Sequence, residues 1–520
     1  MVQDKCLNEH SAVIEIKKEK SRVYSIFDGS FWSVMYGFGE SFFSAFAVFL
    51  KATNLELGFI TSFPQMIGSF FQLFSYKLIS FFGSRKKVVL IFATLQALMH
   101  LLIAIVFFLG EFRLFYLILF ICLYWICGMI MGPAWTSWIG DLVDEHKRGS
   151  YFGLRSKICG FIAFVAYLFA GFILQRNSAT NLTTYYGFLI LFIVAFLARL
   201  ISVIYLSKQY EPKCHFAPEE ANGMVNFVKS AWKTNFGIFV IFMCFFNFAV
   251  FVSAPFFTAY MLNDLRMSYI TFTLVNAIAI ISKIFFMPVW GKASDKFGEK
   301  KIITASTLMM PLIPLLWMMS TNVWYLLVIQ AFSGFVWAGF ELATFNYIFS
   351  ATDPKKRVSY VAYYNVLTGI SIFFGALAGS LLVKLNFIFW SQYLFVFFLS
   401  FVFRLLTFFI FVPRLKEVRE VKSISNKRLI FDVIMATPGT TLRDLFVPLI
   451  RSPFVKKTPL KNFLSRHMIV EINDFLDKEY TKSRHMVHDV EIWLMHFHKD
   501  DKRHSKDLQS IHRIKRHDFR

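Results

Sequence analysis

Two acidic residues stand out because they occur inside long apolar runs of the sequence. Glu40 lies in the run Tyr36–Ser41, and Glu341 ends the run Trp337–Glu341. An ionisable side chain at the centre of a hydrocarbon layer costs about 2.5–3.5 kcal/mol, so each of these carboxyl groups needs a reason. A carboxyl group removed from water is able to take up and release a proton near neutral pH. The alternative for both residues is a structural acid that forms a hydrogen bond to a neighbouring helix.

Other polar side chains in apolar runs are candidates for a binding site. Lys283 has three interpretations, which are binding an anionic substrate, pairing with Glu341, and extending its ammonium group to the membrane surface. Tryptophan rings stack on sugar rings or organic cations, and side-chain amides bind hydroxyl groups, although most such residues serve packing. The candidates on these grounds are Gln65, Trp135 and Asn247.

The elements that must hold these residues are membrane helices. Of the 520 residues, 56% are hydrophobic and only 17% are charged, whereas soluble domains carry roughly 25% charge. This composition excludes a soluble, disordered or collagenous chain, and most of the 67 Phe residues must face lipid. Twelve apolar stretches are long enough to cross a hydrocarbon core of about 30 Å as helices. They are residues 30–50, 57–82, 87–109, 114–139, 157–175, 185–207, 236–262, 268–290, 302–320, 323–349, 361–384 and 388–412.

The net charge of +22 is unevenly distributed, and this predicts orientation. Lys and Arg concentrate in every second turn, as in Arg85–Lys87 and Lys355–Arg357, so both termini are expected in the cytoplasm. The final segment has 23 Lys and Arg against 14 Asp and Glu and is expected to contact an anionic inner leaflet. The predicted parts are a cytoplasmic arm (1–28), a first six-helix half (29–208), a central loop (209–235), a second six-helix half (236–412) and a basic, partly amphipathic tail (413–520).

The two halves repeat at an interval of roughly 205–215 residues, in the manner of transporters built from internal repeats. The run Arg148–Tyr151 after the fourth span corresponds to Arg357–Tyr360 after the tenth. Arg199 and Arg404 lie at equivalent depths in the sixth and twelfth spans, where we expect them to reach the membrane surface or to pair with loop acids.

The turn Gly291–Lys301 carries the strongest motif. It resembles the signature of the major facilitator superfamily, Gly-x-x-x-Asp-(Arg/Lys)-x-Gly-x-(Arg/Lys)-(Arg/Lys), nearly in full. In the first-half copy, Tyr76 replaces the first glycine and Ser80 replaces the aspartate. The resemblance covers roughly residues 30–412. It implies an all-α membrane fold in which two six-helix halves rock around a central substrate site.

The resemblance also assigns roles to the residues named above. The first and fourth helices of each half line the central cavity in this family, which implies that Glu40 and Glu341 face it. We expect Glu40, and after it Glu341, to couple transport to proton movement, with Lys283, Asn247, Gln65 and Trp135 as further cavity residues.

A gate is implied at the inner end of the helices. Asp295 is the candidate latch between the halves, and glycines at this turn allow close approach of helices and loop. The alternative is that Lys292–Lys301 is only a basic cytoplasmic loop. Asp141 is expected to pair with Arg148 or Arg155, or else to form a surface salt bridge of little energy. The predicted gate residues are Gly291, Asp295, Gly298, Asp141, Arg148, Arg155 and Arg357.

Motifs for a phosphate-binding loop, a catalytic triad or a zinc site do not occur, so neither an enzyme nor a primary pump is expected. The chain is expected to be a monomer in a bacterial inner membrane, without cofactor or nucleic-acid partner, that binds a small organic solute and a proton or another coupling ion. The missing Gly-Pro motif in the fifth span favours uptake. The alternatives are a drug or metabolite exporter, and a receptor or scaffold on the same fold.

Overall fold

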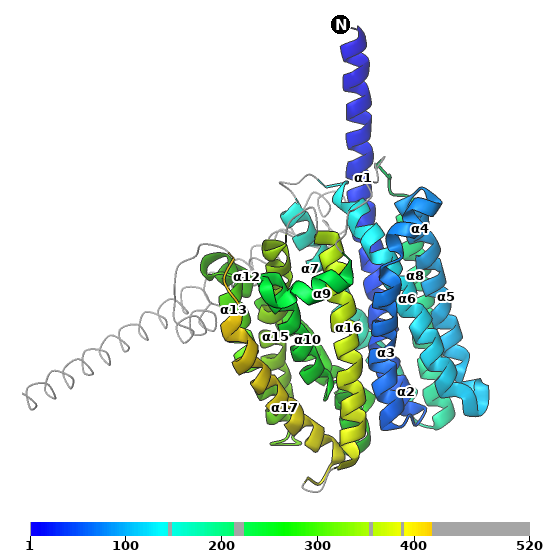
Figure 1. Cartoon of the computed structure of the whole chain (residues 1–520). Helices are drawn as coiled ribbons and strands as arrows, with labels where there is room; N and C mark the ends of the chain where they lie inside the picture. The colour runs from blue at the N-terminus through cyan, green and yellow to red at the C-terminus, as the bar shows by residue number, and fades with distance from the viewer. Residues whose placement is uncertain (1, 144–147, 213–222, 353–356, 386–388, 419–520) are drawn as a thin grey trace, which may run out of the picture. The chain divides into compact units, whose positions relative to one another are not determined.

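The protein is described here by a computed structural model, which covers residues 2–143, 148–212, 223–352, 357–385 and 389–418. Within these ranges every regular element is a helix, and the helices run roughly parallel in one bundle (Figure 1). The predicted all-α membrane fold is therefore confirmed. Most of the predicted basic, partly amphipathic tail, residues 419–520, lies outside the described residues.

The helices of the two halves follow one another along the chain in the same order. The first half contains α1 (Val2–Phe38), η1 (Glu40–Phe42), α2 (Phe43–Phe49), α3 (Asn54–Gln72), α4 (Ser75–Phe82), α5 (Arg85–Ile105), η2 (Val106–Phe112), α6 (Arg113–Gly140), α7 (Arg148–Arg176) and α8 (Asn181–Ser207). The second half contains α9 (Met224–Ser230), η4 (Ala231–Lys233), α10 (Asn235–Phe251), α11 (Phe256–Ala259), η5 (Tyr260–Asp264), α12 (Tyr269–Phe297), α13 (Glu299–Met309), α14 (Leu312–Trp317), α15 (Val323–Ala351), α16 (Arg357–Leu382), η6 (Val383–Leu385), α17 (Gln392–Phe411) and η7 (Val412–Arg414).

All twelve expected spans contain helix in the described part of the chain, but four of them are interrupted. Eight segments of the described chain are long and apolar enough to cross a membrane, and one of these, Arg85–Gly140, joins two expected spans. The interrupted spans are divided between α1 and α2, between α3 and α4, between α10 and α11, and between α13 and α14. Pro311 lies at the last of these breaks, where a proline cannot donate to the helical ladder.

The first helix begins much earlier than the first expected span. α1 already starts at Val2, so the predicted cytoplasmic arm is helical and continuous with the membrane segment. The arm is rich in Lys and Glu, which are good helix formers, and Arg22 Nη2 pairs with Glu15 Oε1 at 2.9 Å on its surface. The arm thus extends α1 at the end of the bundle where α4 lies (Figure 1).

The internal repeat predicted from the sequence is visible in matching contacts. In the first half, Trp138 Nε1 donates to the carbonyl oxygen of Tyr210 at 2.9 Å. In the second half, the Tyr347 hydroxyl donates to the carbonyl oxygen of Lys416 at 2.8 Å. Each bond ties the fourth long helix of its half, α6 or α15, to the chain that leaves the last helix of the same half.

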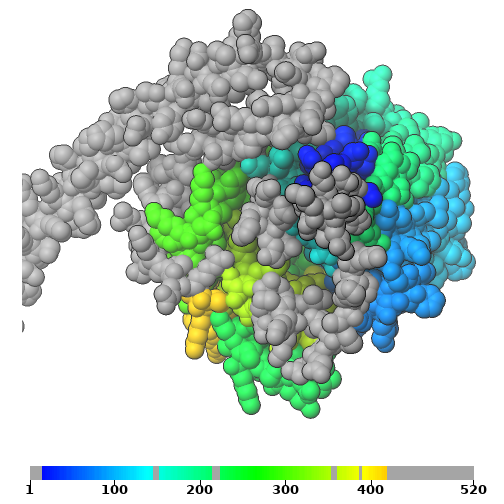
Figure 2. Space-filling model, turned by 90° about the horizontal axis from the view of Figure 1, so that it is seen from above, coloured from blue at the N-terminus to red at the C-terminus, as the bar shows by residue number. Residues whose placement is uncertain are grey.

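The two halves meet mainly along two helix pairs, α3 with α16 and α7 with α12. At the end of the bundle where α2 lies, Asn54 Nδ2 donates to Gln392 Oε1 at 3.4 Å, and the Tyr393 hydroxyl donates to Asn54 Oδ1 at 3.2 Å. We call this the α2 end and the opposite one the α4 end. Figure 2 looks onto the α4 end, where blue and cyan atoms of the first half lie to one side and green to orange atoms of the second half to the other.

Candidate functional site

Glu40 lies at the break between α1 and α2 and is held by a tyrosine of another helix. It begins the short turn η1, which follows the non-helical residue Gly39. The Tyr124 hydroxyl, from the middle of α6, donates to Glu40 Oε2 at 2.7 Å. Within the described part of the chain, Glu40 has no Lys, Arg or His as an ion-pair partner. Its carboxyl group is therefore held by a neutral donor at a point where the helix is interrupted.

A histidine that the sequence analysis overlooked lies beside this pair. His100 of α5 is completely buried, and its ring is edge-on to the Tyr124 ring with centroids 5.1 Å apart. A Cβ atom at Gly39 would lie 2.5 Å from His100 Nε2, so the ring approaches α1 only because that residue is glycine. The criterion that selected Glu40, an ionisable group inside an apolar run, would also have selected His100.

The structure brings Lys283 and Glu341 together as an ion pair between α12 and α15. Lys283 Nζ lies 3.1 Å from Glu341 Oε2, and the two side chains remain 35% and 45% exposed. Of the interpretations open for Lys283, pairing with Glu341 is the one that the geometry realises. The exposure leaves both groups accessible to another molecule.

Tyr36 is within electrostatic range of two carboxyl groups from different halves. It lies on α1, one turn before Glu40, and the charges of both Glu40 and Glu341 act on its hydroxyl group. Glu40 belongs to the first half and Glu341 to the second. The two predicted proton-coupling candidates are therefore within electrostatic range of the same tyrosine.

The two candidate amides bond within their own helices. Asn247 Nδ2 donates to the Met243 carbonyl oxygen at 2.8 Å on α10, and Gln65 Nε2 donates to the Thr61 carbonyl oxygen at 3.4 Å on α3. Both side chains are partly buried. A role for either of them in a cavity remains a prediction.

Trp135 belongs to a different cluster, in the interior of the first half. The Arg155 guanidinium carbon lies 4.6 Å from the centre of a Trp135 ring, in a cation–π arrangement. Arg155 Nη2 lies 3.6 Å from Asp28 Oδ2, and Arg155 Nε donates to the Ser25 carbonyl oxygen at 3.1 Å. Trp135 is therefore grouped with charges that the sequence analysis had not combined into one site.

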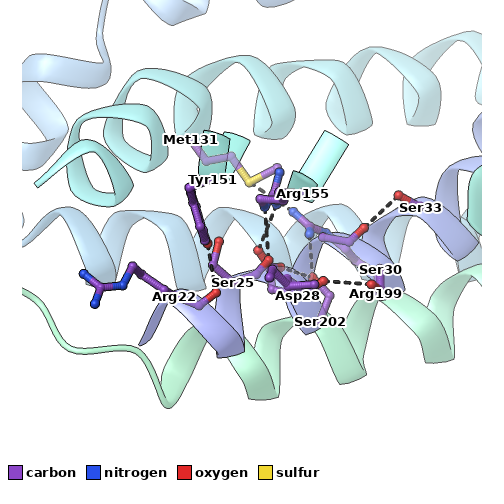
Figure 3. A network of polar contacts seen from close by, with 12 residues as sticks. Arg22, Ser25, Asp28, Ser30, Ser33, Met131, Tyr151, Arg155, Arg199 and Ser202 are labelled. Carbon is purple, nitrogen blue, oxygen red and sulfur yellow. Dashed lines mark hydrogen bonds and ion pairs between the residues drawn. The ribbon is translucent and has the colours of Figure 1, made fainter. Parts of the chain in front are cut away.

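Arg199 completes this cluster, contrary to the expectation that it reaches the membrane surface. It is only 2% exposed, and its Nη1 donates to Ser202 Oγ at 2.9 Å. Ser202 Oγ in turn donates to Asp28 Oδ1 at 2.6 Å (Figure 3). Arg404, the corresponding residue of the second half, is also buried, at 3% exposed, and its Nη1 donates to the Met310 carbonyl oxygen at 3.1 Å. Both arginines point inward because the interior supplies polar partners that lipid cannot.

Asp141 has a partner other than the two that were expected. Its Oδ2 lies 2.7 Å from Nη1 of Arg85, which is 1% exposed and begins α5. Asp141 directly follows α6, which packs against α5, whereas Arg155 is engaged with Asp28. The side chains of the other two predicted gate arginines, Arg148 and Arg357, lie outside the described residues, although their backbones begin α7 and α16.

The second-half turn is only partly as expected. Asp295 is exposed near the end of α12, and it makes no ion pair or hydrogen bond to another described residue. Gly298 has φ +87°, a conformation that requires glycine. A Cβ at Gly291 would lie 3.5 Å from Leu342 Cδ2, an ordinary contact, so close packing does not require that glycine here. Among the described residues, Asp295 therefore forms no contact that would hold the two halves together.

Comparison with known proteins identifies the family. The sequence model of the Major Facilitator Superfamily matches residues 29–258 and 238–470, which together include most of the chain. The chain therefore belongs to this family, and it is a multi-pass membrane protein of a family of secondary transporters. The resemblance carried by the Gly291–Lys301 turn is thereby confirmed.

Individual relatives are more distant. The Multidrug resistance protein MdtG of Salmonella typhi is 30% identical over 179 residues, a match that spans 32% of this chain and 42% of the relative. Among solved structures, the xylose transporter XylE from E. coli aligns over 80% of this chain and 100% of its own, with TM-score 0.58 and 15% identity. The nucleoside transporter NupG aligns over 77% of this chain and 99% of its own, with TM-score 0.52 and 14% identity. At these identities the structural likeness concerns the fold alone.

Proposed function

We propose that this transporter moves a small organic solute by alternating access and that proton binding to Glu40 drives it. The observation that carries the proposal is the hydrogen bond from Tyr124 to Glu40 at the break in the first span. Glu40 is partly buried, and a charge without a counter-charge inside a membrane is costly, so this carboxyl group holds a proton when it is closed to water and releases it when water arrives. Rocking of the halves supplies that change in water access.

The Lys283–Glu341 pair is the second part of the proposal. An exposed ion pair gains little energy, so a solute with a charged or strongly polar group can compete with either partner. The Tyr36 hydroxyl group is within electrostatic range of both Glu341 and Glu40. Binding of a solute at the pair would thus alter the electrostatic surroundings shared with the proposed proton site.

Orientation and location follow from the charge distribution. We place both termini in the cytoplasm of a bacterial inner membrane, with the α4 end facing inward, because Arg85, Lys86 and Lys87 lie there. In this orientation the cross-half bonds of Asn54 lie at the outer end. We further expect a monomer whose basic tail contacts anionic lipid.

The direction of transport has two candidates. The missing Gly-Pro motif in the fifth span favours uptake. A relative of this chain is a multidrug resistance protein, and this observation favours the alternative, an exporter of drugs or metabolites. A receptor or scaffold that transports nothing is the third candidate.

Reconstitution into vesicles with an internal pH-sensitive dye tests the proposal. A panel of sugars, nucleosides, amino acids, organic acids and cationic drugs is added outside, with and without an imposed pH gradient. We expect at least one class to cause proton movement that empty vesicles lack, and the sign of the gradient that accelerates its flux gives the direction. A solute flux that is the same with and without the pH gradient would contradict proton coupling. The absence of flux for every class of solute would favour the receptor or scaffold.

A further inference from the structure

A cavity of about 260 Å³ lies inside the first half, apart from the Lys283–Glu341 pair. Five helices of this half contribute to its wall, so its lining comes from one half and does not depend on contact with the other. Figure 3 shows the polar network to which Asp28, Arg155 and Arg199 of its lining belong. The residues that line it are Asp28, Trp32, Val89, Gly128, Met131, Gly132, Trp135, Arg155, Arg199 and Leu206.

The charges that line this cavity do not balance. Arg155 and Arg199 supply two guanidinium groups, and Asp28 is the one carboxylate among the lining residues. Ser202 bonds to Asp28 and to Arg199 but is neutral. An excess positive charge inside a six-helix bundle is unfavourable unless an anion compensates it. The cavity therefore favours an anionic occupant.

Arg199 has unused hydrogen-bonding capacity. Its side chain is 2% exposed, and its buried Nε has no hydrogen-bond partner among the described residues. Its Nη2 is directed at Met131 Sδ at 3.2 Å, and a thioether is a weak acceptor. Buried guanidinium N–H groups are rarely left without a strong hydrogen-bond acceptor. A carboxylate is the acceptor that matches their planar, forked geometry.

The remaining wall of the cavity suits a planar ring. Trp32 and Trp135 provide aromatic surface, and Gly128 and Gly132 are two lining positions on α6 that carry no side chain. A protein cavity of about 150 Å³ is enough to hold benzene. A volume of about 260 Å³ therefore accommodates a single ring with a carboxylate attached.

We propose that this cavity is a binding site for a small aromatic carboxylate, with the carboxylate on Arg199 and Arg155 and the ring against Trp135 and Trp32. The ligand would complete the hydrogen bonding of Arg199 and cancel the excess charge. This site is additional to the proton site at Glu40, and its existence does not depend on proton coupling or on the identity of the transported solute.

Calorimetric titration of the full-length chain in lipid nanodiscs tests the proposal with three ligands that share a phenyl ring and differ in charge. These are benzoate, the neutral benzamide and the cationic benzylamine. We expect benzoate to bind at least about tenfold more tightly than benzamide, because charge-assisted hydrogen bonds are the strong ones, and benzylamine not to bind. Equal affinity for benzoate and benzamide, or no benzoate binding, would overturn the proposal.

Variants locate the site. Arg199→Gln should weaken benzoate binding by about tenfold or more, because it removes the charge that the carboxylate pairs with. Arg155→Gln provides a second test where Arg199→Gln does not fold. The matched control is Arg404→Gln, the corresponding buried arginine of the second half, which should bind benzoate as the unaltered chain does. Folded Arg199 and Arg155 variants with unchanged benzoate affinity would place the ligand elsewhere and overturn the assignment.

A second readout separates a ring site from a simple anion site. Trp135→Leu should reduce benzoate affinity while leaving the weaker binding of acetate unchanged. Acetate binding as tightly as benzoate would contradict the aromatic part of the proposal. If the chain binds benzoate but transports no solute, the result supports this site and contradicts the proposed transport function. Failure of the site and failure of the proposed function are therefore distinguishable.

Discussion

Glu211 and Glu417 occupy corresponding places in the two halves of the protein. Glu211 Oε1 accepts a hydrogen bond from the backbone N–H of Lys86 at 3.1 Å, and Glu417 Oε2 accepts one from the backbone N–H of Lys300 at 3.0 Å. Each carboxylate thus bonds the first turn of α5 or α13, where backbone N–H groups have no partner within the helix. The chain that leaves the last helix of each half is anchored to the third span of that half.

This symmetry predicts a loss of stability from each of two distant substitutions. Glu211→Ala and Glu417→Ala should each lower the free energy of unfolding by about 0.5–2 kcal/mol, the usual effect of removing a side-chain cap at a helix start. Thermal unfolding of the purified variants in detergent measures this. A loss confined to one of the two variants would contradict equivalent anchoring of the halves.

The hydrogen bond to Glu40 predicts a functional effect at Tyr124. Tyr124→Phe removes the hydroxyl donor and keeps the ring, so the fold should persist while proton-coupled transport falls several-fold. Tyr116→Phe on the same helix is the control, because that residue is exposed at 36%. Vesicle transport assays compare the two, and an equal effect of both substitutions would show that the bond to Glu40 is not needed for coupling.

The close approach of α1 and α5 predicts a steric effect at Gly39. Gly39→Ala places a methyl group 2.5 Å from His100 Nε2, and such overpacking costs about 1–3 kcal/mol. Gly132→Ala is the control, because nothing lies within 4 Å of its added Cβ. Thermal unfolding should show a loss for Gly39→Ala only, and adding His100→Ala should restore part of it. Additive losses in the double variant would mean that the ring is not the obstacle.

The two acidic residues of the predicted gate should differ in their effect on stability. Asp141→Asn weakens the bond to the buried Arg85 and should cost about 1 kcal/mol, since the carboxylate itself is 44% exposed. Asp295→Asn should leave the unfolding temperature unchanged and slow transport, if Asp295 acts only in another conformation. Equal loss of stability in both variants would contradict this division of roles.

The spans and the repeat are the features that the sequence predicts well. An apolar stretch of about 20 residues has only one common solution in lipid, a helix that satisfies its own backbone. The charged turns mark the helix ends independently. The breaks at Gly39 and Pro311 were harder to predict, because glycine and proline also occur in uninterrupted membrane helices, as Pro133 does in α6.

The partners within the site could not be predicted, because they come from different helices. A helix such as α6 is apolar all around, so its periodicity does not show that Tyr124 faces Glu40 rather than lipid. For the same reason the sequence does not indicate the pairing of Asp141 with Arg85, which lies 56 positions away. The Asp28–Arg155 contact likewise joins residues far apart in the chain.

The central claim is that Glu40 is the proton-coupling carboxyl group, and one comparison tests it most directly. Glu40→Gln keeps the shape of the side chain and removes its titratable proton. In vesicles it should abolish solute flux driven by a pH gradient and retain exchange of labelled for unlabelled solute. The matched control is Glu56→Gln, because glutamine preserves the capping box that Glu56 forms with Thr53 at the start of α3, and its coupling should be unaltered. Gradient-driven flux that persists in Glu40→Gln would contradict the account.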